Sequence, residues 1–312
     1  HGLHVMGVVG AAGIRSEKFR GVAPASTIIV QSFSGILSNA PVYVRDHGMV
    51  ITNNSYGNIT ECDEMGVYDL LSRVMDQQAF QMPHLQHVFA AGNSGDSSCA
   101  PYLPGFSNVL SGYQTAKNII SVGNTEVNGN RFPSSSRGPV RDGRIKPEVV
   151  AHGAFVFSTT PINNYGLNNG TSIAAPAVSG GLVLLYQRYR QLNGTDPQNA
   201  LMKALLMNGA SDLGNPGPDF SYGFGKINLL RSVRMMEQNN YFSASINPAA
   251  TNIHNINVGP SIASLKVMLY WNDPAAAPFA STALVNDLNL RVDDPSSTTH
   301  SPPLLNTSPT QV

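Results

Sequence analysis

Charged residues are scarce in this chain of 312 residues. Asp, Glu, Lys and Arg make up 12% of it, about half of the ~25% that is usual in a soluble domain. The 19 basic and 19 acidic residues cancel, so there is no net charge to attract nucleic acid or an anionic membrane. No apolar run approaches the ~20 residues that span a bilayer. The composition therefore gives no basis for a nucleic-acid or membrane partner.

Cysteine is rare as well, with only Cys62 and Cys99 in the chain. Two cysteines are too few for a disulfide scaffold. They form either one bridge, in an oxidising compartment, or a pair of buried thiols. The chain begins with His1 and carries no signal peptide, so we expect an N-terminus that is processed, cut or incomplete.

Short apolar runs alternate with helical patterns as far as about residue 235. Such runs fit strands that are covered on both faces, as in a parallel sheet. The expected strands are Thr27–Gln31, Met49–Asn53, His87–Ala91, Ile119–Gly123 and Glu148–Ala151, and the expected helices are Met65–Gln81, Gly170–Arg190, Asp196–Asn208 and Lys226–Gln238. This alternation predicts an α/β domain with a doubly wound, mostly parallel sheet flanked by helices.

The pattern changes after residue 240. Ile253–Val258, Ser264–Trp271 and Leu288–Val292 alternate apolar and polar residues, with turn residues between them. That alternation is typical of antiparallel strands. We therefore expect a first domain over residues 1–240 and a second, partial antiparallel β-sandwich domain over 241–312 that is cut short.

Three segments carry residues suited to chemistry. The first, His1-Gly2-Leu3-His4, opens an Ala/Gly/Val stretch expected to be a helix buried all round. Its histidines are either a terminal residue and a packed core residue, or a pair one helical turn apart that shares a metal ion. A metal-dependent hydrolase built on this pair would lose activity with a chelator and ignore serine-directed inhibitors.

The second and third segments place polar side chains at turns. Residues 88–95 form a buried strand that ends in small residues and then presents Asn93 in a Gly-flanked loop. That side chain either donates to an oxyanion or favours a left-handed turn. Residues 170–176, Gly-Thr-Ser-Ile-Ala-Ala-Pro, place Ser172 in the first turn of a long helix. There it is either an ordinary cap or a nucleophile beside free N–H groups and the positive end of the helix dipole.

Together these segments resemble, in order, the three signature blocks of the subtilisin-like serine proteases. The family has His-Gly-Thr-His-Val-Ala-Gly, Ala-Ala-Gly-Asn-x-Gly and Gly-Thr-Ser-Met-Ala-Ala-Pro. Other blocks agree too, and the likeness covers roughly residues 1–238. It includes Gly-Val-Ala-Pro at 21–24, Asn-Ser-Tyr-Gly at 54–57 and Tyr-Gly-Phe-Gly-Lys-Ile-Asn at 222–228.

The resemblance implies a serine endopeptidase. Ser172 would attack the scissile carbonyl to form an acyl-enzyme, with His1 as general base. Asn93 would donate to the tetrahedral oxyanion together with the Ser172 N–H. His4 matches a structural histidine of the family and receives no catalytic role.

The resemblance also implies a substrate-binding surface. Two strand ends would flank a broad, apolar specificity pocket and pair with an extended peptide. They are Ser55, Tyr56 and Gly57 on one side, and Ala90, Ala91 and Gly92 on the other. Gly112, before an aromatic residue, is a candidate for the floor of the pocket.

The chain departs from the family pattern at several positions. Leu3 replaces the usual Thr, Ile173 the usual Met, and Ala177 the common His, while His152 stands where Pro is usual. A larger departure is the catalytic Asp, which in the family precedes the His and is absent here. We therefore expect this chain to be nearly inactive alone. The alternative is a non-catalytic, protease-like binding or processing scaffold.

The remaining expectations concern cofactors and surroundings. The chemistry requires no cofactor and no metal. Asp273, Asn286, Asp287 and Asn289, in a segment that resembles the β-sandwich of some bacterial relatives, would supply oxygen ligands for a structural calcium ion or simply cap turns. We expect protein or peptide substrates, a monomer, and a secreted or extracytoplasmic location. A bridge between Cys62 and Cys99 would tie two neighbouring loops.

Overall fold

Four of the five expected strands form one parallel sheet. The computed structural model describes residues 1–58 and 61–312. Within them β1 (Ile51–Asn54), β2 (Gln86–Ala90), β3 (Ile120–Thr125) and β4 (Val149–His152) lie side by side in sequence order. Asn53 pairs with Val88, and Val88 pairs in turn with Ile120. The prediction of a parallel α/β sheet is confirmed.

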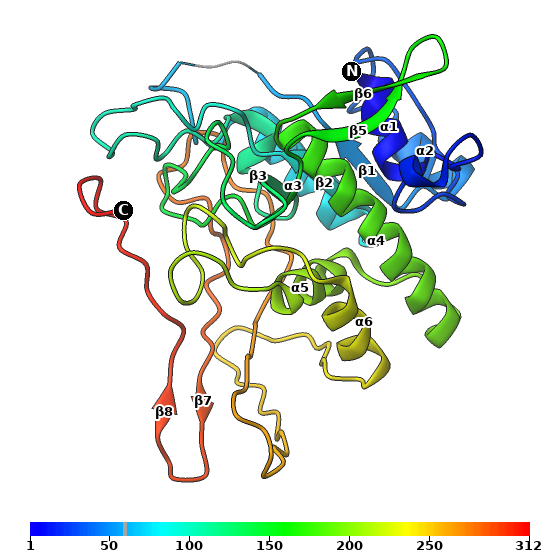
Figure 1. Ribbon diagram of the computed structural model, residues 1–312. Coiled ribbons are helices and arrows are strands. Elements are labelled where there is room, and N and C mark those ends of the chain that lie inside the picture. The colour runs from blue at the N-terminus through cyan, green and yellow to red at the C-terminus, as the bar shows by residue number, and fades with distance from the viewer. Residues whose placement is uncertain (59–60) are drawn as a thin grey trace.

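Helices cover both faces of this sheet (Figure 1). The long helix α4 (Thr171–Asn193) lies across all four strands, and α5 (Asn199–Gly209) and α6 (Leu229–Glu237) pack beside it. On this face Val88 and Ala90 contact the buried side of α4. Phe89 points to the other face, toward Met75 of α3 (Leu70–Gln81). Successive side chains of a strand alternate between faces, so a continuous apolar run fills both cores.

The N-terminal part of the chain lies over one end of α4. Helix α1 (Gly2–Gly10) packs against α4 and against β5 (Val156–Thr160), which forms an antiparallel hairpin with β6 (Asn164–Asn168). Only His4, Val5 and Gly7 of α1 are buried, so the expectation of a helix buried all round is wrong. Helix α2 (Ala40–His47) and the short 3₁₀ helices η1 (Glu17–Phe19) and η2 (Gly112–Thr115) complete the elements before α4.

The fifth expected strand, Thr27–Gln31, is not in the sheet. None of its residues belongs to a helix or strand, and Val30 is 72% exposed. A run of β-branched residues forms a strand only when a neighbouring strand supplies hydrogen-bond partners. No such partner lies beside this segment in the described part of the chain, which is why the prediction is wrong.

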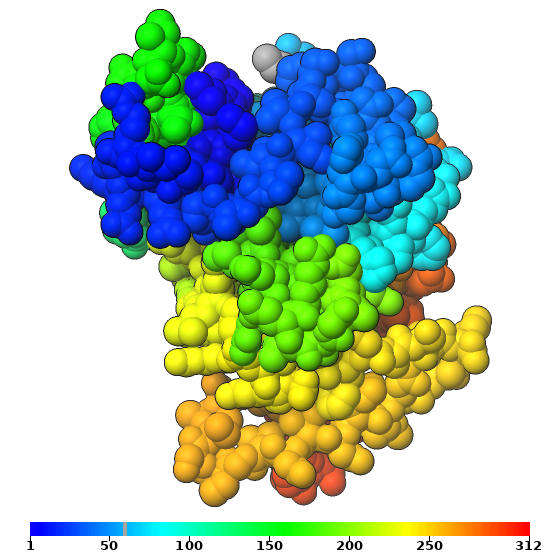
Figure 2. Space-filling model, turned by 90° about the vertical axis from the view of Figure 1, so that its right-hand side faces the viewer, coloured from blue at the N-terminus to red at the C-terminus, as the bar shows by residue number. Residues whose placement is uncertain are grey.

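Most of the expected strands after residue 240 are also absent. The segments Ile253–Val258 and Ser264–Trp271 contain no strand, and Leu288–Val292 contributes only its last residue. The one hairpin described here is β7 (Val292–Asp293) with β8 (Thr299–His300). Alternating apolar and polar residues form a stable sheet only when its apolar face packs against another element, and these segments have no such sheet among the described residues. Residues after about 240, gold to red, lie mainly at the lower end of Figures 1 and 2.

One C-terminal stretch is nevertheless anchored in the peptidase body through Asp273. Its carboxylate accepts hydrogen bonds from the Lys117 ammonium at 2.6 Å and from the N–H groups of Val285 and Asn286, both at 2.8 Å. Both oxygens are thus engaged by nitrogen donors, which disfavours a calcium ion at Asp273. The domain boundary at residue 240 stays a prediction.

A second buried ionic group lies at the amino ends of β3 and β4. The ammonium groups of Lys146 and Lys203 lie 2.5 and 2.8 Å from Glu148 Oε1, while the N–H of Ser121 donates to Glu148 Oε2. Burial alone would raise the pKa of Glu148, but the two ammonium groups together lower it. Burial also lowers the pKa of Lys146 to about 7, against the pull of Glu148. These charges remain buried because each has an oppositely charged partner.

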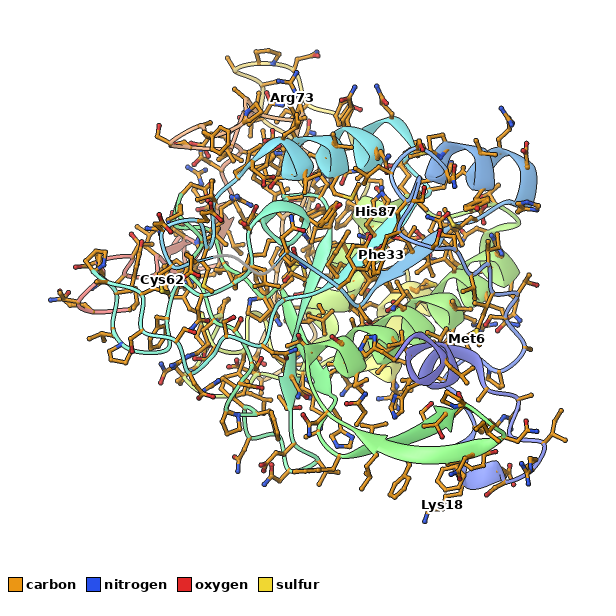
Figure 3. The ribbon with its side chains drawn as sticks, turned by 90° about the horizontal axis from the view of Figure 1, so that it is seen from above. Met6, Lys18, Phe33, Cys62, Arg73 and His87 are labelled. Atoms are coloured by element: carbon orange, nitrogen blue, oxygen red, sulfur yellow. A yellow bond between two sulfur atoms is a disulfide. The ribbon has the colours of Figure 1, made fainter. Side chains whose placement is uncertain are left out.

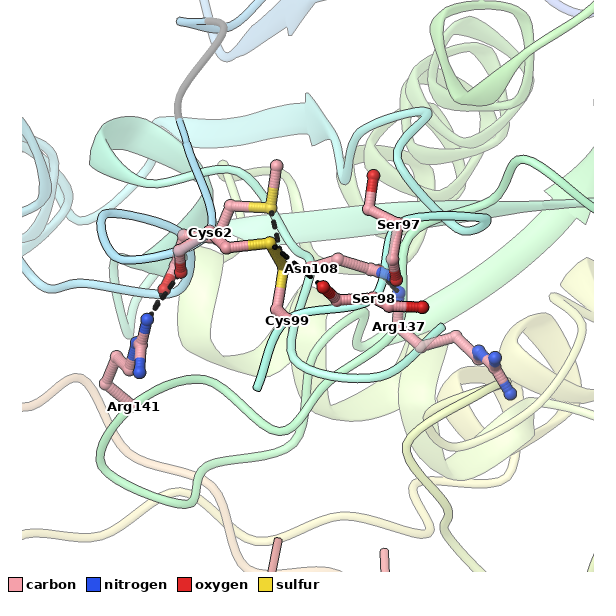
Figure 4. Close-up of a disulfide and its surroundings, with 8 residues drawn as sticks. Cys62, Ser97, Ser98, Cys99, Asn108, Arg137 and Arg141 are labelled. Carbon is pink, nitrogen blue, oxygen red and sulfur yellow. Dashed lines mark hydrogen bonds between the residues drawn. A yellow bond between two sulfur atoms is a disulfide. The ribbon is translucent and has the colours of Figure 1, made fainter. Parts of the chain in front are cut away.

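A disulfide joins the loops that follow β1 and β2 (Figure 4). The Cα atoms of Cys62 and Cys99 lie 5.1 Å apart, within the usual range for a bridge. The guanidinium of Arg141 donates to the carbonyl oxygens of Cys62 and Met65 and so fixes the first loop. The bridge is therefore formed, and the alternative of two free thiols is excluded.

None of the helices in residues 1–58 and 61–312 has the length and apolar character needed to cross a membrane.

We predict that removal of the disulfide lowers the free energy of unfolding. The bridge joins residues 37 apart, and the chain entropy released by opening such a loop corresponds to at most about 4 kcal/mol. Urea denaturation of Cys62→Ala/Cys99→Ala should show this loss, and wild-type protein treated with reductant should show the same one. Equal stability of oxidised and reduced protein would contradict the prediction.

We predict that His87 makes the fold sensitive to mild acid. This residue of β2 is 2% exposed and lies in the interior between α3 and α4 (Figure 3). Its Nδ1 lies 2.8 Å from the Thr52 hydroxyl, while its Nε2 has no partner among the described residues. Burial lowers the pKa of His87 from 6.5 to about 4.

Because the unfolded chain binds this proton more readily than the folded chain, stability is complete above about pH 6.5 and falls as the pH drops toward 4. The contribution is on the order of 3 kcal/mol. Chemical denaturation at pH 7 and pH 4.5 should give a smaller difference for His87→Gln than for wild type. The exposed control His47→Gln should keep the wild-type difference, and an unchanged difference in His87→Gln would refute the assignment.

Candidate active site

The predicted nucleophile lies where the first turn of α4 meets the carboxyl ends of β1 and β2. Gly170 is the N-cap of α4, and its φ is 130°. Residues with a side chain rarely adopt such a positive φ, whereas glycine does so readily. This turn places Ser172 at the second position of the helix. The N–H groups of a first helical turn have no intrahelical acceptor, so they and the helix dipole face whatever lies beside Ser172.

Asn93 is anchored to this same turn. Its Oδ1 accepts hydrogen bonds from the Thr171 N–H at 2.9 Å and from the Thr171 hydroxyl at 3.1 Å. With Oδ1 so engaged, the Nδ2 group remains to donate to a ligand. The structure therefore brings Asn93 and the residue before Ser172 into direct contact, as the motif spacing required.

The strand ends are tied to the helix by further hydrogen bonds. The Ser55 hydroxyl donates to the carbonyl oxygen of Ser172 at 2.7 Å, and the Gly92 N–H approaches the Thr171 hydroxyl at 3.3 Å. Thus two of the predicted substrate-binding residues, one from each strand, contact the first turn of α4. Tyr56 lies behind them, packed edge-on against Phe89.

Leu110 fills the space between the two predicted walls. A Cβ added at Gly57 would come within 2.7 Å of Leu110 Cδ1, and one added at Gly92 within 2.7 Å of Leu110 Cγ. Glycine is required at both positions because the leucine side chain lies against them. The Leu110 N–H also donates to the Ala91 carbonyl oxygen at 3.1 Å. Leu110 thus lies against a glycine of each predicted wall.

Gly112, the expected floor residue, is the first residue of η2, and its role in the pocket stays a prediction. Its nearest neighbours are Leu71 and Asp69 of the α3 region. Gln114 lies near the site, donating from Nε2 to the Tyr56 carbonyl oxygen at 2.8 Å. No sequence signal marked Leu110 or Gln114, because neither belongs to a recognisable motif.

The predicted base, His1, is exposed at the N-cap of α1. Helix α1 packs against α4, but no hydrogen bond joins the His1 ring to Ser172 within the described residues. Among those residues the histidine paired with a carboxylate is His300, 3.2 Å from Asp294, and His1 has no such partner. Nothing in this part of the chain fixes the tautomer or orientation of the imidazole.

His4 is structural and not a metal ligand paired with His1. It is 4% exposed, and its Nε2 lies 3.1 Å from the carbonyl oxygens of both Val156 and Gly166. It thereby joins α1 to the β5–β6 hairpin. In residues 1–58 and 61–312 no three His, Cys, Asp or Glu side chains gather as a metal site would require. The proposed metal-dependent hydrolase has no ligand set here.

Comparison with known proteins agrees with this arrangement. The model of the subtilase family matches residues 1–225. The chain is 31% identical over 237 residues to subtilisin DY of Bacillus licheniformis, covering 73% of this chain and 76% of that protein. It is 26% identical over 242 residues to thermitase of Thermoactinomyces vulgaris, covering 75% of each.

A solved structure shares the fold. The patellamide maturation protease PatA superimposes with a TM-score of 0.59 at 21% identity, over 76% of this chain and 84% of that one. At this identity the likeness concerns the fold alone. The family model covers well over half of the chain, and the signature turn of α4 lies beside its Asn partner. The chain therefore belongs to the subtilase family of serine proteases.

Proposed function

We propose that this chain is the catalytic body of an endopeptidase that cleaves protein or peptide substrates through an acyl-enzyme at Ser172. The observation that carries the proposal is the anchored Asn93 side chain. Its Oδ1 is held by Thr171, which leaves its Nδ2 as a preoriented donor beside the nucleophile.

The chemistry follows from these positions. The Ser172 hydroxyl attacks the scissile carbonyl carbon while His1 accepts its proton. The resulting oxyanion receives hydrogen bonds from Asn93 Nδ2 and the Ser172 N–H. His1 then gives the proton to the leaving amine as the C–N bond breaks. Water, deprotonated by the same imidazole, hydrolyses the acyl-enzyme and releases Ser172.

His1 requires an acid that no described residue supplies. An imidazole without its carboxylate loses its fixed tautomer and the partner that stabilises its charge, which costs on the order of 10⁴ in turnover in this kind of enzyme. We propose that the acid comes from a segment outside this sequence, and that the chain alone is nearly inactive. The edge position of β1 in the described sheet supports an additional strand beside it.

The environment of the enzyme is part of the proposal. The disulfide supports an oxidising compartment and thus secretion. We propose a monomer, because the assigned catalytic residues, His1, Ser172 and Asn93, all come from this chain. No cofactor takes part in the steps above. Calcium, if bound, would require ligands other than Asp273.

We predict that a fluorophosphonate probe, applied in excess for hours, labels Ser172. Such probes react with an activated serine even when turnover is slow. Labelled protein should appear for wild type and for the exposed control Ser261→Ala, but not for Ser172→Ala. Casein hydrolysis by the same sample should be barely detectable.

Two results would contradict this function. Absence of labelling in a sample with a normal melting transition would favour the alternative of a non-catalytic scaffold. Rapid casein hydrolysis by this chain alone would show that His1 needs no acid from outside it.

We further propose that Leu110 restricts the side chain on the acyl side of the scissile bond to small residues. Its contacts with Gly57 and Gly92 support this preference. We predict that Leu110→Ala raises the rate of labelling by a peptidyl phosphonate bearing Phe, relative to one bearing Ala, about tenfold or more. The exposed control Leu304→Ala should leave the ratio unchanged. An equal ratio in wild type and Leu110→Ala would remove Leu110 from the specificity pocket.

A further inference from the structure

A cavity of about 400 Å³ lies apart from the candidate active site. It is open to solvent on one side and is lined by α1, the segment around η1, the junction of β4 and β5, α4, and residues 226–227. None of the residues assigned to catalysis or substrate binding lines it. Its volume falls within the usual range of small-molecule sites.

Two departures from the family pattern meet in this cavity. Ala177 of α4 lines it where the family commonly has His, and His152 at the end of β4 lines it where Pro is usual. A methyl group in place of an imidazole leaves room inside the wall, while His152 adds a polar ring from the opposite element.

The wall of the cavity is apolar. It contains aliphatic and aromatic side chains from four parts of the chain, with the rings of Phe19 and Phe157 5.8 Å apart. Ala177 and five further apolar residues also line it: Val8, Val22, Ala151, Val156 and Ile227. Such a surface binds a hydrocarbon chain or ring by excluding water from it.

The charged residues in the lining are all basic. Lys18, Arg20 and Lys226 join His152 there, and no Asp or Glu lines the cavity. The Lys226 ammonium donates to the carbonyl oxygen of Val127 at 3.3 Å and has no carboxylate partner among the described residues. Arg20 has one carboxylate partner, Glu17, at 3.8 Å on the exposed surface, a distance and setting in which an ion pair is weak.

This charge is local, because the whole chain carries 19 basic and 19 acidic residues. Three cations beside an apolar surface, with Glu17 as a weak partner of Arg20 alone, favour a ligand with a negative head and an apolar body. We propose that this cavity binds an amphipathic carboxylate, a carboxylate group attached to an apolar chain of roughly eight carbons. The head lies toward Lys18, Arg20 and Lys226, and the chain lies against α1 and α4.

A bound ligand would contact both α1 and α4 and so add to the packing between these two helices. Because Val8 belongs to α1 and Ala177 to α4, the ligand contacts the helices that begin next to His1 and Ser172. A ligand that binds only the folded chain stabilises it. The site is thus detectable by binding and by thermal stability, independently of any protease activity.

The test is calorimetric titration of this chain with octanoate, octan-1-ol and acetate, each paired with a melting curve. We expect octanoate to bind and to raise the melting temperature, and octanol and acetate to bind at least about tenfold more weakly. Equal affinity for octanol would show that the basic residues take no part, and no binding of octanoate would overturn the proposal.

Variants localise the binding. Lys18→Gln/Arg20→Gln removes two exposed charges without touching the core and should weaken octanoate binding about tenfold or more. Ala177→Leu places a larger apolar side chain in the part of the cavity beside α4 and should weaken octanoate binding. Arg73→Gln removes an exposed charge of α3, on the opposite side from Lys18 in Figure 3, and should bind as wild type does.

A melting curve of unliganded Ala177→Leu establishes whether that variant is folded. If Ala177→Leu is unfolded, Lys18→Gln/Arg20→Gln alone tests the proposal. Octanoate binding unchanged in Lys18→Gln/Arg20→Gln, or lost equally in Arg73→Gln, would place the ligand elsewhere and refute the proposal.

Discussion

The contact between Asn93 and the first turn of α4 is the constraint on which the rest of the site depends. One side-chain oxygen accepts from both the N–H and the hydroxyl of Thr171, so the loop after β2 and the start of α4 cannot move independently. The Ser55 hydroxyl adds a second tie from the loop after β1 to the carbonyl of Ser172. Three separate elements therefore hold Ser172, the proposed nucleophile, and each ends or begins at the carboxyl end of the same parallel sheet.

At the opposite end of that sheet, where its strands begin, buried ion pairs connect the surrounding elements. Lys146 and Lys203 share Glu148 just before β4, and Lys117, just before β3, carries Asp273 of the C-terminal segment. Buried ions of this kind contribute little net stability, but removal of one partner leaves an expensive uncompensated charge. The arrangement fixes which C-terminal residues dock on the body. It also separates the two functions of the sheet, with ionic anchoring at its amino edge and chemistry at its carboxyl edge.

Disulfide and aromatic packing complete the frame around the substrate side. The bridge between Cys62 and Cys99 joins the two loops that continue from β1 and β2. Tyr56 and Tyr113 pack against Phe89 behind them. The walls near Leu110 are thus supported both covalently and by packing, and a side chain placed between them determines how much room a substrate has.

The sequence by itself determined the parallel sheet, its helices and the placement of Asn93 beside Ser172. The sheet and its helices follow from periodicity, whereas the pairing of Asn93 with Ser172 was implied by the resemblance to the subtilisin-like proteases. Only the tertiary structure decided which segments become strands. Thr27–Gln31 and Ile253–Val258 have strand-like sequences, yet they form none, because a strand requires a hydrogen-bonding neighbour that local sequence cannot specify. Leu110 and the cavity between α1 and α4 likewise depend on contacts between distant residues. In the sequence, His152 and Ala177 are isolated departures from the family pattern. In the fold, both side chains line the same cavity.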